Sequence, residues 1–426
     1  MRLIILVLAL GACGRIGFDD AARDVPVDAL LSVDADPQLD AAPLDAAPLD
    51  AGPGICQVPG EEQLAIGYQH ACALRGGRMW CWGDNEFGQL GTGDANLGDD
   101  RDQPTRVDGR EEWVKAAAGL RHTCALDCWG AIWCWGGNDR GQLGADDGIP
   151  GADSSVPQQI ADARPWIDLF AGRDHTCAIA ADETLWCWGG NGAAQLGIGT
   201  QGGAADTGRP TQVVMEPPDP AEDFGWRQVG AGDDHTCAVK HDETLWCWGA
   251  NGNGQLGQGG GDLDRTRPNR VAAGQRWSLV SSGLDASCAL DDAQELYCWG
   301  RNEEGQLGLG GTGDRDFPEA VMPATRWSEL SFGYEHACGV QSDGTLWCWG
   351  ANRAGELGIG AGSVGSNMQA PAQVGAATGW RDLGAGQEYT CAIRDGLRCW
   401  GEGSQGRLGN GGSTDLADPS PVIALP

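Results

Sequence analysis

The feature that most constrains this chain is a unit that recurs seven times between residue 61 and the end of the sequence. Every copy contains Trp-Gly, at Trp82, Trp135, Trp188, Trp248, Trp299, Trp349 and Trp400, with spacings of 53, 53, 60, 51, 50 and 51 residues. Most copies continue with Asn-x-x-Gly-Gln-Leu-Gly, as in Asn85–Gly91. A period of about 50 residues is typical of propeller blades or solenoid coils.

Tryptophan use follows the same unit. Six copies open with a second tryptophan, six residues before a glycine: Trp113, Trp166, Trp226, Trp277, Trp327 and Trp380. The first copy has Glu61 at this position. Together with a third tryptophan two residues before Trp-Gly in five copies, the repeat accounts for 18 of the 19 tryptophans and leaves only Trp129 outside.

The contents of one copy favour a propeller over a solenoid. In the third copy we expect four strands, Trp166–Ala171, His175–Ala180, Thr184–Gly189 and Pro210–Val214, separated by Gly, Asp or Pro and without helical periodicity. Four antiparallel strands in each of seven copies predict an all-β, seven-bladed β-propeller. Residues Pro419–Pro426 match the fourth-strand position, so the C-terminal end is expected beside the first blade, where it closes the ring.

Fourteen of the 17 cysteines form pairs at one place in each copy. The pairs are Cys72 with Cys81, Cys124 with Cys134, Cys177 with Cys187, Cys237 with Cys247, Cys288 with Cys298, Cys338 with Cys348, and Cys391 with Cys399. With Asp182 at the hairpin tip, Cys177 and Cys187 face each other across two strands, so we predict one disulfide per blade. Cys56 and Cys128 are left over and are predicted to pair by parity.

A metal site is the alternative reading of these cysteines. His-x-Cys occurs in five copies, at His70, His122, His175, His235 and His336, and could suggest zinc ligands. The fifth and seventh copies replace the histidine with Ala286 and Tyr389 but keep both cysteines. We therefore expect structural, hydrogen-bonded histidines and no metal; His241, outside the pattern, is expected on a surface hairpin.

The N-terminal residues indicate export. Arg2 precedes the apolar run Leu3–Leu10, which is too short to span a bilayer and is typical of a signal peptide. Leu10-Gly11-Ala12-Cys13 resembles a bacterial lipobox, so Cys13 is the predicted lipidated residue. A plain cleaved signal peptide is the alternative. Gly14, not Asp, follows Cys13, which removes the simplest inner-membrane retention signal and favours the outer membrane or cell surface.

These observations divide the chain. We expect a signal peptide over 1–13, an Asp/Ala/Pro-rich disordered tether over 14–60, and the propeller over 61–426. Its repeats lie near 61–112, 113–165, 166–225, 226–276, 277–326, 327–379 and 380–426.

The stretch Ala171–Gly199 resembles the regulator-of-chromosome-condensation repeat, with its Gly-x-x-His-[Ser/Thr] element and its Trp-Gly-x-Asn-x-x-Gly-Gln-Leu-Gly signature. The resemblance covers 61–426 and implies a seven-bladed propeller. It also implies nucleotide exchange on a small GTPase and chromatin binding, as in the eukaryotic namesake. Neither role suits an exported chain of net charge −32. A secreted bacterial β-lactamase-inhibiting protein is similar in fold, so exported propellers of this kind can bind proteins.

No catalytic motif emerges, and nucleic acid is excluded as a partner by the negative charge. The Asp-rich loops Gly93–Asp102 and Asp146–Asp153 offer oxygen ligands for a structural Ca²⁺ but match no established calcium-loop spacing, so solvated loops are favoured and no cofactor is predicted. We expect a monomeric, non-catalytic binding module for an envelope protein or glycan, with function on the variable loops Thr92–Asp102, Ala145–Val156 and Thr200–Gly208. An enzyme regulator or inhibitor, an exchange-factor-like activity and a structural envelope protein are the alternatives.

Overall fold

The computed structural model describes residues 60, 62–94, 99–107, 109–145, 149, 151–215, 224–259, 261 and 263–425. The predicted signal peptide, the lipidation residue Cys13, the tether up to residue 59, Cys56 and Glu61 lie outside the described residues. The part that the structure describes contains no helix long and apolar enough to cross a membrane.

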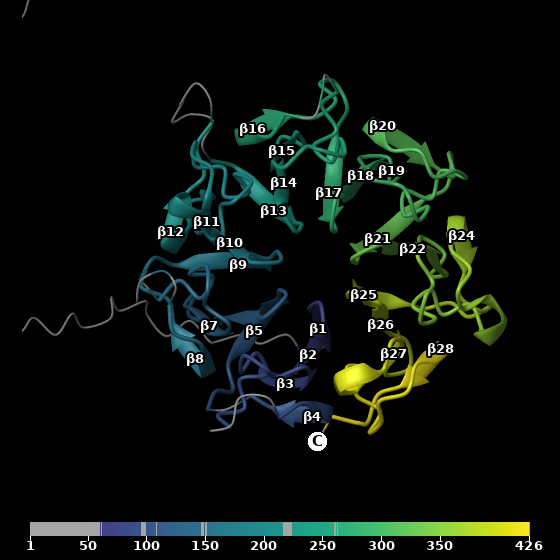
Figure 1. The fold of residues 1–426 in the computed structure, drawn as a ribbon, viewed down its shortest axis with the longest axis horizontal. Coiled ribbons are helices and arrows are strands. Elements are labelled where there is room, and N and C mark those ends of the chain that lie inside the picture. Colours follow the sequence, from purple (N-terminus) through teal and green to yellow (C-terminus); the bar gives the residue numbers. More distant parts are fainter. Residues whose placement is uncertain are drawn as a thin grey trace, which may run out of the picture. The chain divides into compact units, whose positions relative to one another are not determined.

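Seven sheets, each of four antiparallel strands, are arranged in a ring (Figure 1). The ends of the inner strands line a small cavity at its centre, here called the channel. The chain builds each blade from the channel outwards, and the inner strands of neighbouring blades contact one another around the ring. The inner strand of the last blade contacts that of the first, which completes the circle. The predicted seven-bladed, all-β propeller is therefore confirmed.

The strands occupy equivalent positions in every blade. The inner strands are β1 (Gln63–Ile66), β5 (Trp113–Ala118), β9 (Trp166–Ala171), β13 (Trp226–Ala231), β17 (Trp277–Ser282), β21 (Trp327–Phe332) and β25 (Arg381–Ala385). The second strands are β2 (His70–Arg75), β6 (His122–Asp127), β10 (His175–Ala180), β14 (His235–Lys240), β18 (Ala286–Asp291), β22 (His336–Gln341) and β26 (Tyr389–Ile393). The third strands are β3 (Arg78–Gly83), β7 (Ile132–Gly136), β11 (Leu185–Gly189), β15 (Leu245–Gly249), β19 (Leu296–Gly300), β23 (Leu346–Gly350) and β27 (Leu397–Gly401). The outer strands are β4 (Arg101–Arg106), β8 (Ser154–Gln159), β12 (Thr207–Gln212), β16 (Arg265–Arg270), β20 (Arg315–Val321), β24 (Met368–Gln373) and β28 (Leu416–Pro421). Short 3₁₀ turns, η1 (Gly203–Ala205), η2 (Ala361–Ser363) and η3 (Ser404–Gly406), are the only helical segments among the described residues.

The outer strands begin earlier than predicted. β12 covers Thr207–Gln212 instead of Pro210–Val214, and β28 covers Leu416–Pro421 instead of Pro419–Pro426. The prolines that the sequence predicts as strand starts lie inside the strands. Every outer strand carries one: Pro104, Pro157, Pro210, Pro268, Pro318, Pro371 and Pro419. Proline lacks an N–H, so it fits an edge strand, and the register with the third strand shifts beside it. The prolines also protect seven outer edges from pairing with another chain.

The hydrophobic core lies between blades and consists of seven clusters. Between the second and third blades, Ile132 and Leu143 face Trp166 and Trp188. The opening tryptophan and the Trp-Gly tryptophan of one blade pack together, with ring centroids 5.9–6.2 Å apart in six blades. Six blades thus each present an indole pair to the preceding blade, which accounts for the repeated use of tryptophan in the sequence.

The predicted blade disulfides are all present. Cys177 lies opposite Cys187 in the β10–β11 pair, and the same register holds in the other six blades. The other six bonds join Cys72 to Cys81, Cys124 to Cys134, Cys237 to Cys247, Cys288 to Cys298, Cys338 to Cys348, and Cys391 to Cys399. In each bond the two Cα atoms are 4.1 Å apart, the narrow separation of a directly opposed, non-hydrogen-bonded pair. These cysteines are at most 1% exposed, so the bonds lie within the core.

The ring closes without a sheet that combines strands from the two ends of the chain. The first blade is built from β1–β4 and the last from β25–β28, and the C-terminal end lies beside β4 (Figure 1). Trp82 of the first blade donates through Nε1 to the carbonyl of Arg407, 3.0 Å away. The N–H of Gln387 donates to the carbonyl of Tyr68 at 3.0 Å. Side-chain and backbone hydrogen bonds between blades therefore hold the ring closed.

Candidate functional site at the channel mouth

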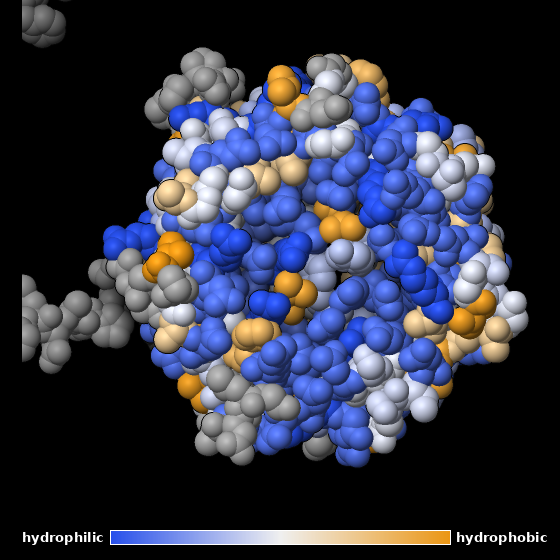
Figure 2. Space-filling view, viewed as in Figure 1, coloured by the Kyte–Doolittle hydropathy of each residue, from blue (hydrophilic) through white to orange (hydrophobic). Residues whose placement is uncertain are grey.

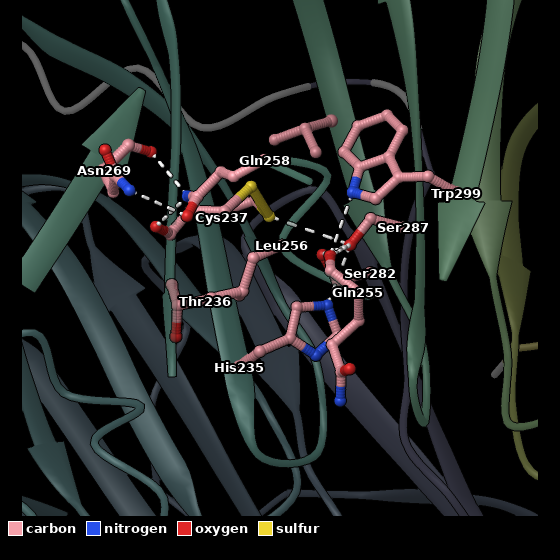
Figure 3. Close-up of a disulfide and its surroundings, with 12 residues drawn as sticks. His235, Thr236, Cys237, Gln255, Leu256, Gln258, Asn269, Ser282, Ser287 and Trp299 are labelled. Carbon is pink, nitrogen blue, oxygen red and sulfur yellow. Dashed lines mark hydrogen bonds between the residues drawn. A yellow bond between two sulfur atoms is a disulfide. The ribbon is translucent and has the colours of Figure 1, made fainter. Parts of the chain in front are cut away.

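The five repeat histidines join neighbouring blades. Each is fully buried, and its Nε2 lies 2.8–3.0 Å from a hydroxyl oxygen of the next blade. The pairs are His70–Thr123, His122–Thr176, His175–Thr236, His235–Ser287 and His336–Thr390. Figure 3 shows this arrangement around His235. The prediction of structural, hydrogen-bonded histidines is confirmed.

The hydrogen-bond directions make these imidazoles poor bases. Thr123 Oγ1 donates to the Gln89 carbonyl at 2.8 Å, so it must accept its other bond from His70 Nε2–H. Trp135 Nε1 donates to the same carbonyl at 2.9 Å. Burial lowers the pKa of His70 to about 3, so its ring is neutral at ordinary pH. His70 and the Gln89 carbonyl of the first blade are thus bonded to Thr123 and Trp135 of the second, and these hydrogen bonds hold the two blades together.

Two junctions lack the histidine, and both also lack the receiving hydroxyl. Between the fifth and sixth blades, Ala286 replaces His and Ala337 replaces Thr. Phe332 fills the space: a Cβ on Gly283 would lie 2.2 Å from its Cδ1, just as a Cβ on Gly172 would lie 2.2 Å from His175 Cε1.

The junction between the last and first blades uses a different substitute. Tyr389 occupies the histidine position, and its hydroxyl donates to the His70 carbonyl of the first blade at 2.6 Å, with the Gly67 carbonyl 3.0 Å from the same oxygen. Ala71 stands where other blades have the receiving hydroxyl. The repeat histidines and their substitutes therefore serve assembly of the ring, and the functional chemistry must lie elsewhere.

The connections of each blade open on two faces. Because adjacent strands are antiparallel, the turn from inner to second strand and the connection from third to outer strand share one side, here called the loop face. The tight turns between second and third strands lie on the opposite side, the hairpin face. The predicted variable loops Thr92–Asp102, Ala145–Val156 and Thr200–Gly208 all join third to outer strands and therefore belong to the loop face.

A polar pocket of about 240 Å³ lies on the loop face at the mouth of the channel. It is lined by Tyr68, Gln69, Asp84, Glu86, Phe87, Leu120, Arg121, Arg173, Tyr334 and Gln387. Most of these side chains come from the turn that follows the inner strand, so five blades converge on one site. Tyr68 and Tyr334 meet edge to face with ring centroids 6.0 Å apart, and Gln69 Nε2 donates to Gln387 Oε1 at 3.0 Å.

Below the mouth the channel narrows. The next cavity has a volume of only about 70 Å³ and is lined by the inner-strand ends, including Ile66, Ala118, Ala231 and Phe332. The mouth is therefore a small polar recess, whose volume suits a side chain or a short loop of a partner. Figure 2 shows one face of the ring, which is largely hydrophilic with small separate apolar patches.

The charges of the inner-strand turns are segregated around the mouth. Arg121 and Arg173 belong to the second and third blades. The acidic residues lie on the third to seventh blades: Asp174, Asp233, Asp234, Asp285, Glu335 and Glu388. On the sixth blade Glu335 is ion-paired with Arg301, at 2.9 Å, and with Arg353. On the fourth blade, Asp233 contacts Arg173 at 3.5 Å, and Arg173 is equally close to Asp174. Asp234 and Asp285 form no ion pair with a described basic side chain.

The other sequence-predicted site residues have clear positions. Cys128 is disulfide-bonded, but Cys56, its predicted partner, lies outside the described residues, so that pairing stays a prediction. Of the Asp-rich loops, 95–98, 146–148 and 150 lie outside the described residues. Asp100 and Asp153 accept backbone N–H bonds from Asn85 and Asn138, at 3.1 and 2.8 Å. Across the described ranges no three His, Cys, Asp or Glu side chains are grouped to hold a metal.

His241 also lies where predicted. It occupies the turn between β14 and β15, its side chain is 58% exposed, and Nε2 is 3.7 Å from Glu183. The buried histidine–hydroxyl pairs join blades and are closed to solvent, so among the described residues the channel mouth is the strongest candidate for a binding site. Sequence reasoning missed this mouth because its residues differ in type from copy to copy.

The fold and the site define a repeat propeller with a binding recess at one end of its channel. A family model of the regulator of chromosome condensation (RCC1) repeat matches residues 76–126, 130–179, 182–239, 242–290, 295–340 and 343–393. A second model of this repeat matches shorter segments, such as 62–89 and 166–195. The chain belongs to the RCC1 repeat family.

Among curated proteins, the ultraviolet-B receptor UVR8 of Arabidopsis thaliana is 31% identical over 253 residues, covering 58% of this chain and 54% of the receptor. The mouse E3 ubiquitin-protein ligase HERC2 is 30% identical over 254 residues, covering 58% of this chain and 5% of the ligase. The matches thus span about half of UVR8 and a small part of HERC2.

Solved structures show the same fold. Human WBSCR16 superposes with a TM-score of 0.66 at 20% identity, covering 78% of this chain and 85% of that protein. Yeast RCC1 (Prp20), in complex with Kap60, superposes with a TM-score of 0.65 at 21% identity, covering 77% and 79%. At this identity the likeness supports the fold alone.

Proposed function

We propose that this chain is an exported, lipid-anchored binding protein of the bacterial cell envelope, which holds a protein partner on the loop face and is not itself an enzyme. The channel mouth carries this proposal, because it gathers charges, two tyrosines and variable loops on one face of a rigid ring. The repeat histidines are buried and hydrogen-bonded, so they offer no solvent-accessible base. Yeast Prp20, solved in complex with Kap60, is a family member that binds a protein.

Two independent features support export. The lipobox-like Leu10–Cys13 follows an apolar run, and every blade contains a disulfide, which belongs to an oxidising compartment. We expect Cys13→Ala to shift the chain from the membrane fraction to the soluble fraction of cells and to abolish fatty-acid labelling. Unchanged labelling and membrane partitioning would exclude Cys13 as the anchor.

Partner binding can be tested by affinity purification of the solubilised, oxidised full chain from envelope extract, followed by mass spectrometry. Glu86 is exposed and lines the mouth, whereas Asp292 is exposed in the turn between β18 and β19 on the hairpin face. We expect a stoichiometric protein that Glu86→Arg loses and the matched Asp292→Arg variant retains. Recovery of cell-wall glycan alone, or of nothing, would reject the protein-partner version and favour glycan binding or a passive envelope role.

A further inference from the structure

The hairpin tip of the second blade departs from the repeat at two adjacent positions. The turn between β6 and β7 carries Cys128 and Trp129. In three other blades the position of Trp129 is held by an aspartate whose carboxylate accepts the N–H of a threonine two residues later: Asp182, Asp242 and Asp343. A cysteine and a tryptophan therefore stand together where the other tips have small, polar or charged residues.

The turn itself does not need Trp129. Asp127 stabilises it instead, because its carboxylate accepts the N–H groups of Trp129 and Ala131 at 3.0 and 2.9 Å. The fifth blade has the same arrangement: Asp291 accepts the equivalent N–H at 2.8 Å, and Ala293 stands at the Trp129 position. The indole is thus available for a contact outside the turn, and Trp129 is 60% exposed. Tryptophan is enriched where one surface contacts another.

The bonding state of Cys128 identifies what lies beside Trp129. Cys128 is disulfide-bonded. The other fourteen described cysteines are joined to one another in the seven blade disulfides. The chain has 17 cysteines, so two remain as partners for Cys128, namely Cys13 and Cys56. Both precede residue 60, so the bond must come from the segment before the propeller.

The position of the first strand favours Cys56. β1 begins at Gln63 on the hairpin face, the same side as Cys128. β1 contacts β5, and the N–H of Cys128 donates at 3.0 Å to the carbonyl of Glu112, the residue before β5. Seven residue steps separate Gln63 from Cys56, and an extended chain covers about 24 Å in seven steps, more than twice the roughly 10 Å between packed sheets. Cys13 lies 50 steps from Gln63, and closing that longer loop costs more entropy.

The residues around Cys56 also suit the exposed indole. Val58 precedes Pro59, and a residue before proline favours an extended backbone. In an extended segment Cys56 and Val58 point to the same side, whereas Ile55 points to the other. A bond from Cys56 to Cys128 therefore brings Val58 towards Trp129.

We propose that residues 55–58 form a strap across the hairpin tip of the second blade, with Cys56 bonded to Cys128 and Val58 packed on the indole of Trp129. The strap links the segment before the first blade covalently to the second blade, whereas each blade disulfide joins two strands of one hairpin. It holds the chain before residue 60 on the hairpin face and leaves the channel mouth on the loop face uncovered. The inference goes beyond the proposed function and needs neither the lipid anchor nor the partner.

Peptide mapping of the purified full chain tests the bond. The oxidised chain is digested without reduction, and linked peptides are identified by mass spectrometry before and after reduction. We expect Cys128 to be linked to Cys56. A link from Cys128 to Cys13, a link between two chains through Cys128, or a free Cys128 thiol would overturn the inference.

Hydroxyl-radical footprinting with residue-resolved mass spectrometry tests the cover on Trp129. Phe317, which is 59% exposed on β20, is the reference for an uncovered aromatic ring in the same chain. We expect Trp129 of the wild type to be oxidised more slowly than Phe317, although indole is the more reactive ring. The double variant Cys56→Ser and Cys128→Ser, which leaves no odd thiol, should raise the oxidation of Trp129 severalfold and leave that of Phe317 unchanged.

Two single variants separate the cover from the bond. Val58→Ser keeps the disulfide and should still raise the oxidation of Trp129, because it removes the side chain that we place on the indole. Ile55→Ser is the matched control and should leave that oxidation unchanged, since its side chain points away from the ring. An equal rise with Ile55→Ser, or no rise with Val58→Ser, would overturn the packing of Val58 on Trp129.

The double variant is expected to fold, because the sixth blade has Ser342 at the Cys128 position. Seven intact blade disulfides and an unchanged circular-dichroism spectrum establish this. Oxidation of Trp129 as fast as that of Phe317 in the wild type, or no rise in the folded double variant, would overturn the strap. A partner lost with Glu86→Arg and an anchor lost with Cys13→Ala would then still uphold the proposed function, so the two failures are distinguishable.

Discussion

The junction between the fifth and sixth blades should be transferable to another place in the ring. His175, Thr236 and Ala231 occupy, between the third and fourth blades, the positions that Ala286, Ala337 and Phe332 occupy in that junction. The perturbation is the triple variant His175→Ala, Thr236→Ala and Ala231→Phe, made together with each single variant. If the phenyl ring replaces the histidine–hydroxyl pair, the three changes must compensate one another.

Each single variant is expected to lower the free energy of unfolding. Thr236→Ala leaves His175 Nε2 buried without its 3.0 Å partner and should cost about 1–3 kcal/mol. His175→Ala opens a cavity in a fully buried site and should cost about 2–5 kcal/mol. Ala231→Phe alone forces a ring into space that His175 fills, which costs about 1–3 kcal/mol.

Non-additivity is the measurable result. Summed, the single variants predict a loss of roughly 4–11 kcal/mol, whereas a transplanted junction should lie within about 2 kcal/mol of wild type. Urea unfolding of the oxidised chain, followed by tryptophan fluorescence, gives each free energy of unfolding. A triple variant as unstable as the sum would refute the view that Phe332 substitutes for the histidine–hydroxyl pair.

Two further predictions follow from the same junctions and from the core. Burial lowers the histidine pKa from 6.5 to about 3 at His70, His122, His235 and His336, and to about 4 at His175. Below pH 6.5 the unfolded chain therefore binds protons that the folded chain does not. The free energy of unfolding is highest above that pH and falls on acidification. Each histidine should lower the free energy of unfolding by roughly 2 kcal/mol between pH 6.5 and 5. Asp233 and Asp285 oppose this loss in part, because burial raises their pKa values. Urea midpoints at both pH values measure the net loss, and the triple variant, which lacks His175, should show a weaker dependence of stability on pH. Because the blade cysteines are at most 1% exposed, dithiothreitol should release their thiols only in concentrated urea, and rapid release from the native chain, seen by mass spectrometry after alkylation, would contradict their burial.

Most of the strands and all seven blade disulfides can be predicted from the sequence, because every blade repeats the same turn residues and the same cysteine positions. Glycine and aspartate mark the first three strand boundaries, and the fixed cysteine spacing places Cys177 opposite Cys187. The outer strand begins three residues earlier than the sequence predicts, because proline is typical of a strand boundary. The recurrence of Pro210 in all seven copies instead identifies a position inside an edge strand.

Contacts between blades were harder to foresee. His70 binds Thr123, 53 residues away, and no single copy shows that pairing. A comparison across copies reveals it, because the histidine and the hydroxyl are lost together: the fifth copy has Ala286 where the sixth has Ala337, and the seventh has Tyr389 where the first has Ala71. The channel mouth offers no such pattern. Tyr68, Leu120, Arg173 and Tyr334 share only a turn position, and ring closure alone brings them into one site.

The central claim, that a protein partner binds the loop face, is tested most directly by site-specific photocrosslinking in cells. A photoreactive residue replaces Glu86 at the channel mouth in one strain and Asp292 on the hairpin face in another. The account predicts a discrete protein adduct from position 86 that is absent from position 292. Adducts from position 292 alone, or none from position 86 in correctly exported chain, would contradict it.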